Sequence, residues 1–505
     1  MKDNISTAIG ESSRNGIFSE PPAKPIITDT DEIKKQYTFW RNSIFIISYL
    51  IYVIAYMGRR NFSIAMPFMN SEMGINAEEQ GLVLMISSFV YGLGRFINGS
   101  IADRGNVRTS LPKNIILAGL FNAGMILLPL LAQTNRVSHN VLVIYMCLFW
   151  GISNWYQSAL FPYCAKSLIR WFPNTTRATW WASWSTSHEL GSFLAMNISL
   201  PIAKATFLYF GKWALEAMFF VPFLLSSLIG IIGFFALQDK PTSIGLPDVE
   251  EICGTKAAKL TIAEKEQQDQ EAGMSYYQIL KKHIIYNKNM WNMGLICFCI
   301  YIFRMGPVDW LFKILIGEQV HSTNFLETIE NIDSLAALKS SMLCGFGFLG
   351  TLFAPLISEK LFAGRRVPAC FWCLAAGAVS VFGIWVGSSP FSPAIGHQLA
   401  KNIVIFLSLG VAGFGVCAPQ VLIGGVVSVE SASKRVGAAA AGFVGFLGYF
   451  GAAVSQIING KLLVFSISRY GDARIILLYW GCIALLGAVL CIPIWNMQPR
   501  KEYSH

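Results

Sequence analysis

The stretch SIFIISYLIYVIAYMGRRNFSIAMPFM, residues 43–69, decides the fold class of this chain. It carries no charged residue before Arg59, and a helix of about 20 apolar residues is long enough to cross a bilayer. Comparable apolar segments follow near residues 80–103, 112–132, 141–168, 177–206, 212–237, 290–316, 335–361, 366–388, 397–428, 434–465 and 473–495. The sequence therefore predicts an all-α membrane protein with about twelve transmembrane helices.

The composition excludes an ordinary soluble protein. Hydrophobic residues make up 54% of the 505 residues and charged residues only 13%, whereas soluble domains average roughly 25% charged residues. The net charge of +10 comes mostly from Lys and Arg in short loops, where they orient helices, so we expect no nucleic-acid partner. The 11 cysteines fall mostly in apolar runs, and no metal-ligand cluster, cofactor motif or nucleophile–base pair indicates an enzyme.

The predicted helices fall into two blocks of six with a polar segment between them. The expected parts are an N-terminal tail (1–41), a six-helix half (42–237), a central loop (238–288), a second six-helix half (289–496) and a C-terminal tail (497–505). Tyr56-Met-Gly-Arg59 in the first helix is echoed by Tyr301-Ile-Phe-Arg304 in the seventh. Two related halves of six helices are typical of major-facilitator-type transporters, whose site lies at the midplane between the halves.

Loop charge predicts the orientation of the helices. The turn after the second helix holds Arg104, Arg108 and Lys113, and the loops after the fourth and eighth helices are also basic. The loops on the opposite side are acidic, as in Glu78 and Glu79. Since short cytoplasmic loops are enriched in Lys and Arg, we expect both termini and the central loop in the cytoplasm.

Arginines occur deep inside predicted helices. Arg304 falls near the middle of the seventh helix, and Arg59 and Arg60 fall past the middle of the first. An arginine at a helix centre costs about 2.5–3.5 kcal/mol on insertion scales, so such residues are functional candidates that face a cavity or a partner. Tyr52, Tyr56 and Arg59 share one helical face by their i, i+4, i+7 spacing, whereas Arg60 points about 100° away.

Two opposed arginines at the midplane suit a phosphate ligand. A guanidinium group binds two oxygens at once and stays protonated, and two such groups roughly neutralise a phosphate monoester. We therefore interpret Arg59 and Arg304 as phosphate-binding residues, with a purely structural role as the alternative. Arg60 is interpreted as the partner of Asp309 in the other half, with a local pair between Asp309 and Lys313 at i+4 as the alternative.

Three further ionisable residues lie inside predicted helices. His188, four residues after Trp184, is interpreted either as a phosphate donor or proton participant, or as a hydrogen-bonded core residue. The adjacent Glu189 is interpreted either as a partner of the site or as a proton carrier. Arg95 follows Tyr91 at i+4 and either lines the path or extends to the membrane interface.

A charged turn follows the second helix. Asp103, Arg104 and Arg108 crowd this short turn on the predicted cytoplasmic side. We predict that they form a cytoplasmic gate, which latches the helix ends without contacting substrate.

Several motifs resemble the organophosphate–phosphate antiporters of the major facilitator superfamily. The stretches that carry the resemblance are GRRNFSIAMPFM (58–69), YGLGRFINGSIADR (91–104), TWWASWSTSHELGS (179–192), YIFRMGPVDW (301–310) and AAAGFVGFLGYFG (439–451). The likeness runs from about Tyr37 to Met497 and implies the major facilitator fold.

The resemblance also implies roles for individual residues. It carries phosphate binding to Arg59 and Arg304 and substrate binding to His188. It implies an inter-half latch between Arg60 and Asp309. It implies a substrate cavity lined by Tyr52, Tyr56, Tyr91, Arg95, Trp155, Trp184 and Tyr449.

The chain departs from the family pattern at some positions. Glu189 stands where relatives usually have Asn, Cys417 replaces a lining Tyr of glycerol-3-phosphate transporters, and Cys344 replaces a second acid on the eighth helix. The run TWWASWSTSH (179–188) is most similar to glucose-6-phosphate carriers, so hexose 6-phosphate is slightly favoured over glycerol 3-phosphate.

These observations lead to a functional hypothesis. We expect a monomeric carrier in a bacterial cytoplasmic (inner) membrane that exchanges an organic phosphate ester for inorganic phosphate by alternating access. One alternative is a membrane sensor of hexose phosphate that acts through a kinase partner. Another is a proton symporter for a different small solute that uses Glu189 and His188.

Overall fold

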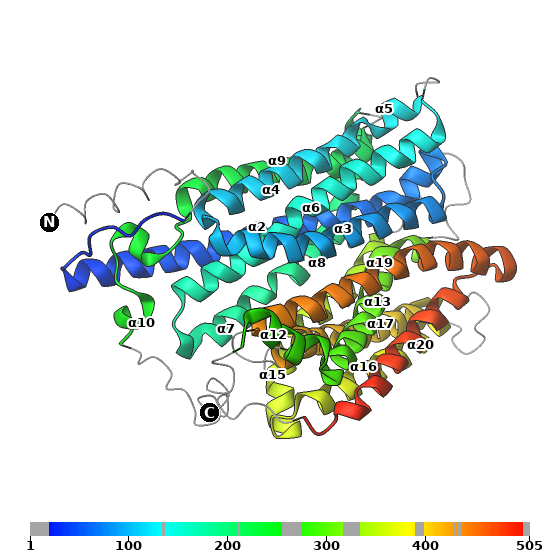
Figure 1. The fold of residues 1–505 in the computed structure, drawn as a ribbon. Helices are drawn as coiled ribbons and strands as arrows, with labels where there is room; N and C mark the ends of the chain where they lie inside the picture. Colours follow the sequence, from blue (N-terminus) through cyan, green and yellow to red (C-terminus); the bar gives the residue numbers. More distant parts are fainter. Residues whose placement is uncertain are drawn as a thin grey trace.

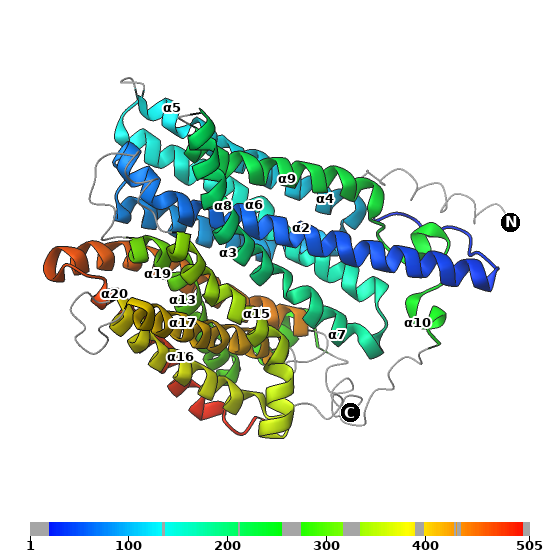
Figure 2. The same cartoon turned by 180° about the vertical axis from the view of Figure 1, so that it is seen from behind.

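The long helices of the chain form two groups. The computed structural model describes residues 20–133, 137–210, 213–254, 274–316, 334–388, 398–428, 431 and 436–497. The helices of residues 30–236 gather on one side and those of residues 288–490 on the other (Figure 1). The view from behind shows the same division (Figure 2). This is the two-half arrangement that the hydropathy pattern predicts.

Each half is built from six long helical segments. The first half contains α2 (Thr30–Met73), α3 (Ala77–Arg104), α4 (Val107–Ala123) with η1 (Gly124–Leu127) and α5 (Leu128–Gln133), α6 (His139–Trp171), α7 (Asn174–Ser185) with α8 (Ser187–Phe210), and α9 (Ala214–Ala236). The second half contains α13 (Lys288–Ile316), α15 (Ser334–Phe362), α16 (Arg366–Ser388), α17 (Gln398–Val421) with η4 (Leu422–Val427), α19 (Gly437–Tyr470), and α20 (Arg474–Leu490). Short elements between and after the halves are η2 (Pro241–Ile244), α10 (Val249–Ile252), α12 (Tyr276–Leu280), η3 (Lys281–Ile285) and η5 (Ile492–Ile494).

Most of these segments meet the requirements of a membrane span. Within the described ranges, 11 are long and apolar enough to cross a membrane, judged by length and composition. α6 occupies the place of the predicted segment 141–168 and is not among them. Its apolar run is interrupted by buried polar side chains, including Asn154, Gln157 and Lys166. The prediction of an all-α membrane protein with about twelve helices is confirmed.

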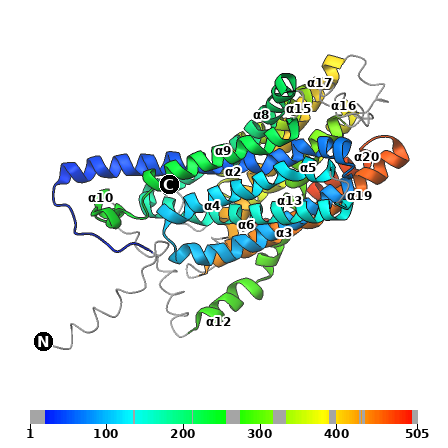
Figure 3. The same ribbon diagram turned by 90° about the horizontal axis from the view of Figure 1, so that it is seen from above.

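α2 begins well before the apolar stretch that predicts it. The Asp29 side chain accepts hydrogen bonds from the backbone N–H groups of Asp31 (3.0 Å) and Glu32 (3.5 Å), which satisfies donors of the first turn. The helix ends at Gly74, whose φ of 66° is left-handed and favours glycine. The first turns of α2 and the short helix α10 project beyond the other long helices at one end of the molecule (Figure 3).

The two halves pack backbone against backbone near the start of α3. A Cβ atom on Gly81 would lie 2.7 Å from the backbone oxygen of Gln456, and one on Gly460 would lie 2.5 Å from that of Ala77. Small residues thus let α3 and α19 approach closely, as is common between helices in membranes. Because α2 and α3 run in opposite directions, this contact lies at the end of the molecule away from the start of α2.

Candidate functional site

Arg59 lies on α2 among aromatic rings. Its Nε donates a hydrogen bond to Oε1 of Gln157 on α6, at 3.0 Å. Its guanidinium carbon lies 4.0 Å from the ring centre of Tyr91 and 4.5 Å from that of Tyr56, as in cation–π contacts. Within the described ranges no carboxylate pairs with Arg59.

Arg304 lies on α13 and is almost fully buried, with 2% of its surface exposed. Its Nη2 donates to Oε1 of Glu189 on α8 at 2.5 Å, so this ion pair joins the two halves. The same oxygen lies 3.3 Å from Nε2 of His188 and accepts from Sγ of Cys417 at 3.2 Å. Glu189, whose role the sequence left open, is therefore the direct partner of a predicted phosphate-binding arginine.

Aromatic rings from both halves gather beside Arg59. Ring centroids lie 4.6 Å apart for Tyr91 and Tyr449, and 4.8 Å apart for Tyr449 and Tyr301. Tyr91 belongs to the first half, and the other two rings belong to the second. The ring of Tyr56 lies 5.6 Å from that of His188. The structure thus brings together predicted residues that are far apart in the sequence.

The remaining predicted lining residues belong to helices of the first half. Tyr52 packs against Trp184, with ring centroids 4.6 Å apart. The guanidinium carbon of Arg95 lies 3.9 Å from the ring centre of Phe161. The role of Arg95 in lining a substrate path stays a prediction. Trp155 packs closely against α3, where the two helices α3 and α6 meet.

Arg60 points away from these rings and pairs across the halves. Its Nη1 donates to Oδ1 of Asp309, and both side chains are buried. The other carboxylate oxygen of Asp309 accepts from Nε2 of Gln456 at 2.6 Å. Lys313 donates instead to Oε1 of Gln80 on α3, at 2.5 Å. The structure thus forms the inter-half pair and not the local alternative, while the action of this pair as a latch stays a prediction.

Two amide side chains that bond to these charges do not stand out in the sequence. Gln157 accepts from Arg59, and Gln456 donates to Asp309. Gln456 also accepts from Nε1 of Trp310 at 2.6 Å. Both glutamines are buried inside largely apolar helices. A glutamine inside a predicted membrane span indicates a polar contact between helices, because a polar group at membrane depth requires a partner.

The predicted cytoplasmic gate is fastened by a lysine that the sequence did not single out. Nζ of Lys166 donates to three backbone oxygens at the end of α3, that of Asp103 among them, at 2.7–3.0 Å. The Asp103 side chain is exposed, and Nε of Arg108 donates to a backbone oxygen of α9 at 3.3 Å. The side chain of Arg104 lies outside the described residues. The gating role of this turn remains a prediction.

An acidic residue ahead of α2 joins the same basic cluster. Glu20 pairs with Lys166 at 3.1 Å and with Arg170, which also donates to Asp239 at 2.5 Å. Partial burial by itself would raise the pKa of the Glu20 carboxyl, but the hydrogen bonds from Arg170 and Lys166 outweigh it and lower the pKa to about 2. Charge therefore fastens the segment before α2 to α6.

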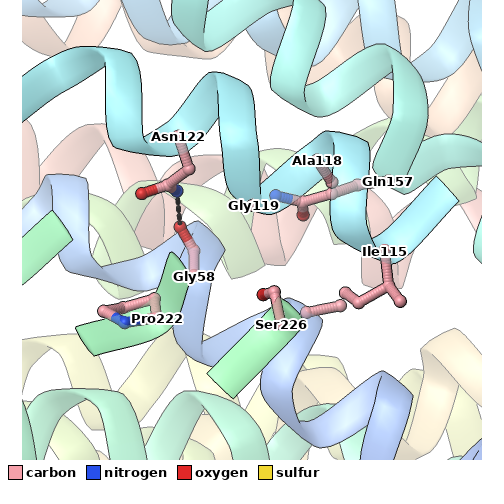
Figure 4. A pocket seen from close by; sticks show the side chains of 9 residues that line it. Gly58, Ile115, Ala118, Gly119, Asn122, Gln157, Pro222 and Ser226 are labelled. Carbon is pink, nitrogen blue, oxygen red and sulfur yellow. Dashed lines mark hydrogen bonds between the residues drawn. The ribbon is translucent and has the colours of Figure 1, made fainter. Parts of the chain in front are cut away.

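The first half is closely packed behind Arg59. A crevice there is lined by Ala55, Gly58, Ile115, Ala118, Gly119, Asn122, Gln157, Pro222 and Ser226 (Figure 4). It is too small for a water molecule, and Nδ2 of Asn122 donates to the backbone oxygen of Gly58 at 2.6 Å. This crevice therefore offers no room for a ligand behind Arg59.

A larger cavity lies farther along α2. It has a volume of about 260 Å³ and is lined by Glu72, Met73, Pro129, Ala132, Gln133, Val137, His139 and Leu142. Glu72 lies about 20 Å from Arg59 along the helix axis, so this cavity is separate from Arg59.

Comparison with known proteins identifies the family. The sequence profile of the Major Facilitator Superfamily matches residues 48–456. The chain belongs to this superfamily. The match spans both halves and places this integral, multi-pass protein among membrane transport proteins and not among enzymes.

Three bacterial relatives are similar along almost the whole chain. The probable hexose phosphate transport protein of Chlamydia trachomatis serovar D is 29% identical over 494 residues, covering 97% of this chain and 99% of its own. The membrane sensor protein UhpC of Salmonella typhimurium is 29% identical over 488 residues, with 96% and 98% covered. The glycerol-3-phosphate transporter of Bacillus subtilis is 28% identical over 477 residues, with 94% and 97% covered. These relatives confirm the family resemblance that the motifs carry.

Solved transporters share the fold. A bacterial homologue of the human lysosomal transporter Spinster, in an inward-facing and occupied conformation, superposes with a TM-score of 0.62 at 13% identity, covering 90% of this chain and 96% of its own. A D-xylose–proton symporter superposes with a TM-score of 0.60 at 13% identity, covering 91% and 98%. At this identity the likeness shows the fold alone.

Proposed function

We propose that this chain exchanges an organic phosphate ester for inorganic phosphate across a bacterial cytoplasmic membrane, with hexose 6-phosphate favoured over glycerol 3-phosphate. The names of its relatives support a phosphate ester as substrate, because they include a hexose phosphate transport protein and a glycerol-3-phosphate transporter. In this proposal the carrier works as a monomer with both termini in the cytoplasm.

The position of Arg59 and Arg304 carries the proposal. They occupy echoing positions in the first helix of each half. Arg59 faces the rings of Tyr56 and Tyr91, and Arg304 pairs with a carboxylate from the first half. Tyr56 and His188 lie beside them and offer a hydroxyl and an imidazole to the remaining phosphate oxygens. One guanidinium group from each half can bind one phosphate bidentately, and such a ligand draws the halves together.

Charge explains why the transport would be an exchange. A guanidinium group without a carboxylate partner, such as that of Arg59, resists enclosure in a low-dielectric interior until an anion neutralises it. Both the ester and inorganic phosphate satisfy this need, and both compete for Arg59 and Arg304. Release of one anion on one side therefore favours binding of the other before the carrier returns.

Counterflow in proteoliposomes tests this function. Vesicles loaded with inorganic phosphate should take up labelled hexose 6-phosphate, with unlabelled glycerol 3-phosphate competing more weakly. Arg59→Lys and Arg304→Lys should each lower the exchange rate roughly tenfold or more, because lysine keeps the charge but loses the bidentate contact. Full exchange in both variants would overturn the phosphate-binding role of the pair.

A sensor is the second candidate, since the relatives include the membrane sensor protein UhpC. Uptake by cells that lack other phosphate-ester carriers discriminates between the two. Growth on hexose phosphate through this chain alone supports a carrier, whereas ligand binding without uptake supports a sensor.

A further inference from the structure

Glu189 places a negative charge where the proposed substrate would bind. Its carboxylate, 1% exposed, accepts from Nη2 of Arg304 at 2.5 Å. Glu189 lies on α8 in the first half, and Arg304 lies on α13 in the second. The pair therefore links the halves in the way that a bound phosphate links them in the proposed function.

The surroundings of this carboxylate enclose it from several helices. Besides Arg304, its Oε1 faces Nε2 of His188 at 3.3 Å and Sγ of Cys417 at 3.2 Å. A Cβ atom on Gly347 of α15 would lie 2.7 Å from Sγ of Cys417 and 3.4 Å from Cδ of Glu189. Helices α8, α13, α15 and α17 thus hold the carboxylate, and of these neighbours only Arg304 carries a permanent charge.

The two predicted phosphate-binding arginines differ in whether a carboxylate already pairs with them. Arg59 faces tyrosine rings and an amide, and no described carboxylate pairs with it. Arg304 already has a full negative charge in contact. An arriving phosphate therefore finds Arg59 available and must displace Glu189 from Arg304.

We propose that Glu189 is an internal anion that takes the place of substrate phosphate on Arg304 in the empty carrier. This inference rests on the proposed function and refines its coupling. An unpaired arginine in a low-dielectric interior is costly, and that cost opposes closure of an empty carrier. Glu189 removes the cost at Arg304, so the empty carrier can change conformation and net transport accompanies exchange.

Displacement leaves the carboxylate with defined neighbours. When phosphate takes Arg304, Glu189 keeps His188 and Cys417 within reach. Substrate and carboxylate compete for one guanidinium group, so removal of the carboxylate should strengthen phosphate binding. A carboxylate that only orients Arg304 for substrate would have the opposite effect.

The first test asks whether removal of the Glu189 carboxylate strengthens or weakens phosphate binding. In purified Glu189→Gln, which keeps the shape of the side chain and loses its charge, inorganic phosphate should bind roughly tenfold more tightly, within the usual range of coupling between sites. Phosphate affinity is read from thermal-shift titrations of the full chain. Unchanged or weaker binding overturns the proposal. Glu189→Asn gives an independent reading if the first variant does not fold.

The second test compares net efflux with exchange. Proteoliposomes are loaded with labelled inorganic phosphate and diluted into buffer with or without external phosphate. The ratio of net efflux to exchange should fall roughly tenfold in Glu189→Gln, because the empty carrier then holds a bare Arg304. Equal ratios in the wild type and the variant overturn the proposal.

Two matched variants control this comparison. Glu189→Asp keeps a carboxylate beside Arg304 and should keep much of the wild-type ratio. Glu72→Gln makes the same chemical change on α2, about 20 Å along the helix axis from Arg59, and should leave the ratio unchanged.

The two proposals fail in different ways. Absence of phosphate-for-ester exchange in the wild type overturns the proposed function, whatever Glu189 does. Normal exchange in the wild type, with unchanged phosphate affinity and an unchanged ratio in Glu189→Gln, overturns only the role of Glu189.

Discussion

Two ion pairs join the halves through the same helix, α13, and they differ in how their carboxylates are held. Asp309 bonds through both oxygens, since Oδ1 accepts from Arg60 and Oδ2 accepts from Gln456 at 2.6 Å. Glu189 bonds through Oε1, which Arg304 shares with a histidine and a cysteine. In both pairs the arginine Nε has no partner among the described residues, so the difference lies with the carboxylates.

This difference indicates in which ion pair a ligand can replace the carboxylate. A carboxylate with both oxygens bonded is costly to move, because each lost hydrogen bond leaves a buried polar group unpaired. A carboxylate bonded through one oxygen loses less when it leaves. The Asp309 pair is therefore suited to holding the halves together, and the Glu189 pair is suited to competition with an anion.

The largest expected effect comes from breaking the fully bonded pair. Asp309→Asn removes the charge that compensates the buried Arg60 and should lower the free energy of unfolding by about 3–5 kcal/mol. Thermal unfolding of the purified protein in detergent measures this loss. The double variant Arg60→Gln with Asp309→Asn should recover part of it, because no bare charge remains. Wild-type stability of Asp309→Asn would contradict a structural role for this pair.

Phosphate should tell the two pairs apart. Glu189→Gln also leaves a buried arginine without its carboxylate, but there phosphate can replace the lost anion. Saturating phosphate should therefore raise the melting temperature of Glu189→Gln more than that of the wild type, by the usual linkage of binding to stability. Phosphate should give no extra stabilisation to Asp309→Asn. Equal phosphate-induced shifts of the melting temperature in the two variants would contradict the proposed difference between the two pairs.

A smaller effect should come from the neighbours of each carboxylate. Gln456→Ala removes a 2.6 Å bond to Asp309 and leaves Trp310 without its acceptor. It should cost about 1–3 kcal/mol of unfolding free energy, as expected for unsatisfied buried groups. Cys417→Ala removes the weaker neighbour of Glu189 and should cost less. Denaturation of both variants side by side checks the order, and the reverse order would contradict the comparison.

The smallest effect is expected outside the membrane, at Glu20. Its pKa of about 2 lies below the ordinary value of 4.5, so folding favours the ionised form. The stability that it contributes is present above pH 4.5 and is lost as the pH falls from 4.5 towards 2. Glu20 is partly exposed, so the contribution is modest. Unfolding of the wild type and Glu20→Gln between pH 3 and pH 7 should converge towards the acidic end, and a constant difference would contradict the pair with Arg170.

Helical periodicity within residues 43–69 predicts that the neighbouring residues Arg59 and Arg60 lie on different faces of one helix. The i, i+4, i+7 spacing placed Arg59 with Tyr52 and Tyr56, and the structure holds Arg59 over the ring of Tyr56. The 100° turn placed Arg60 on a different face, and the structure directs it to Asp309. These inferences were accessible because the geometry of a single helix follows from sequence spacing.

The partner of Arg304 cannot be predicted from helical spacing. Glu189 and Arg304 are separated by 115 positions and lie in different halves. Gln456 and Asp309 are separated by 147 positions, and Lys166 reaches the end of α3 from another helix. Such contacts depend on how whole helices cross, which no local spacing specifies.

The sequence by itself determined that this protein crosses a membrane many times, that it has two related halves, and that arginines lie inside its helices. Hydropathy and spacing carry this information because a bilayer admits only apolar, internally hydrogen-bonded segments. Only the tertiary structure decided that Arg60 pairs with Asp309, which bonds through both carboxylate oxygens, and that Arg304 pairs with Glu189. The physical reason is that the net charge at a buried site depends on every helix that surrounds it, and those helices come from both halves of the chain.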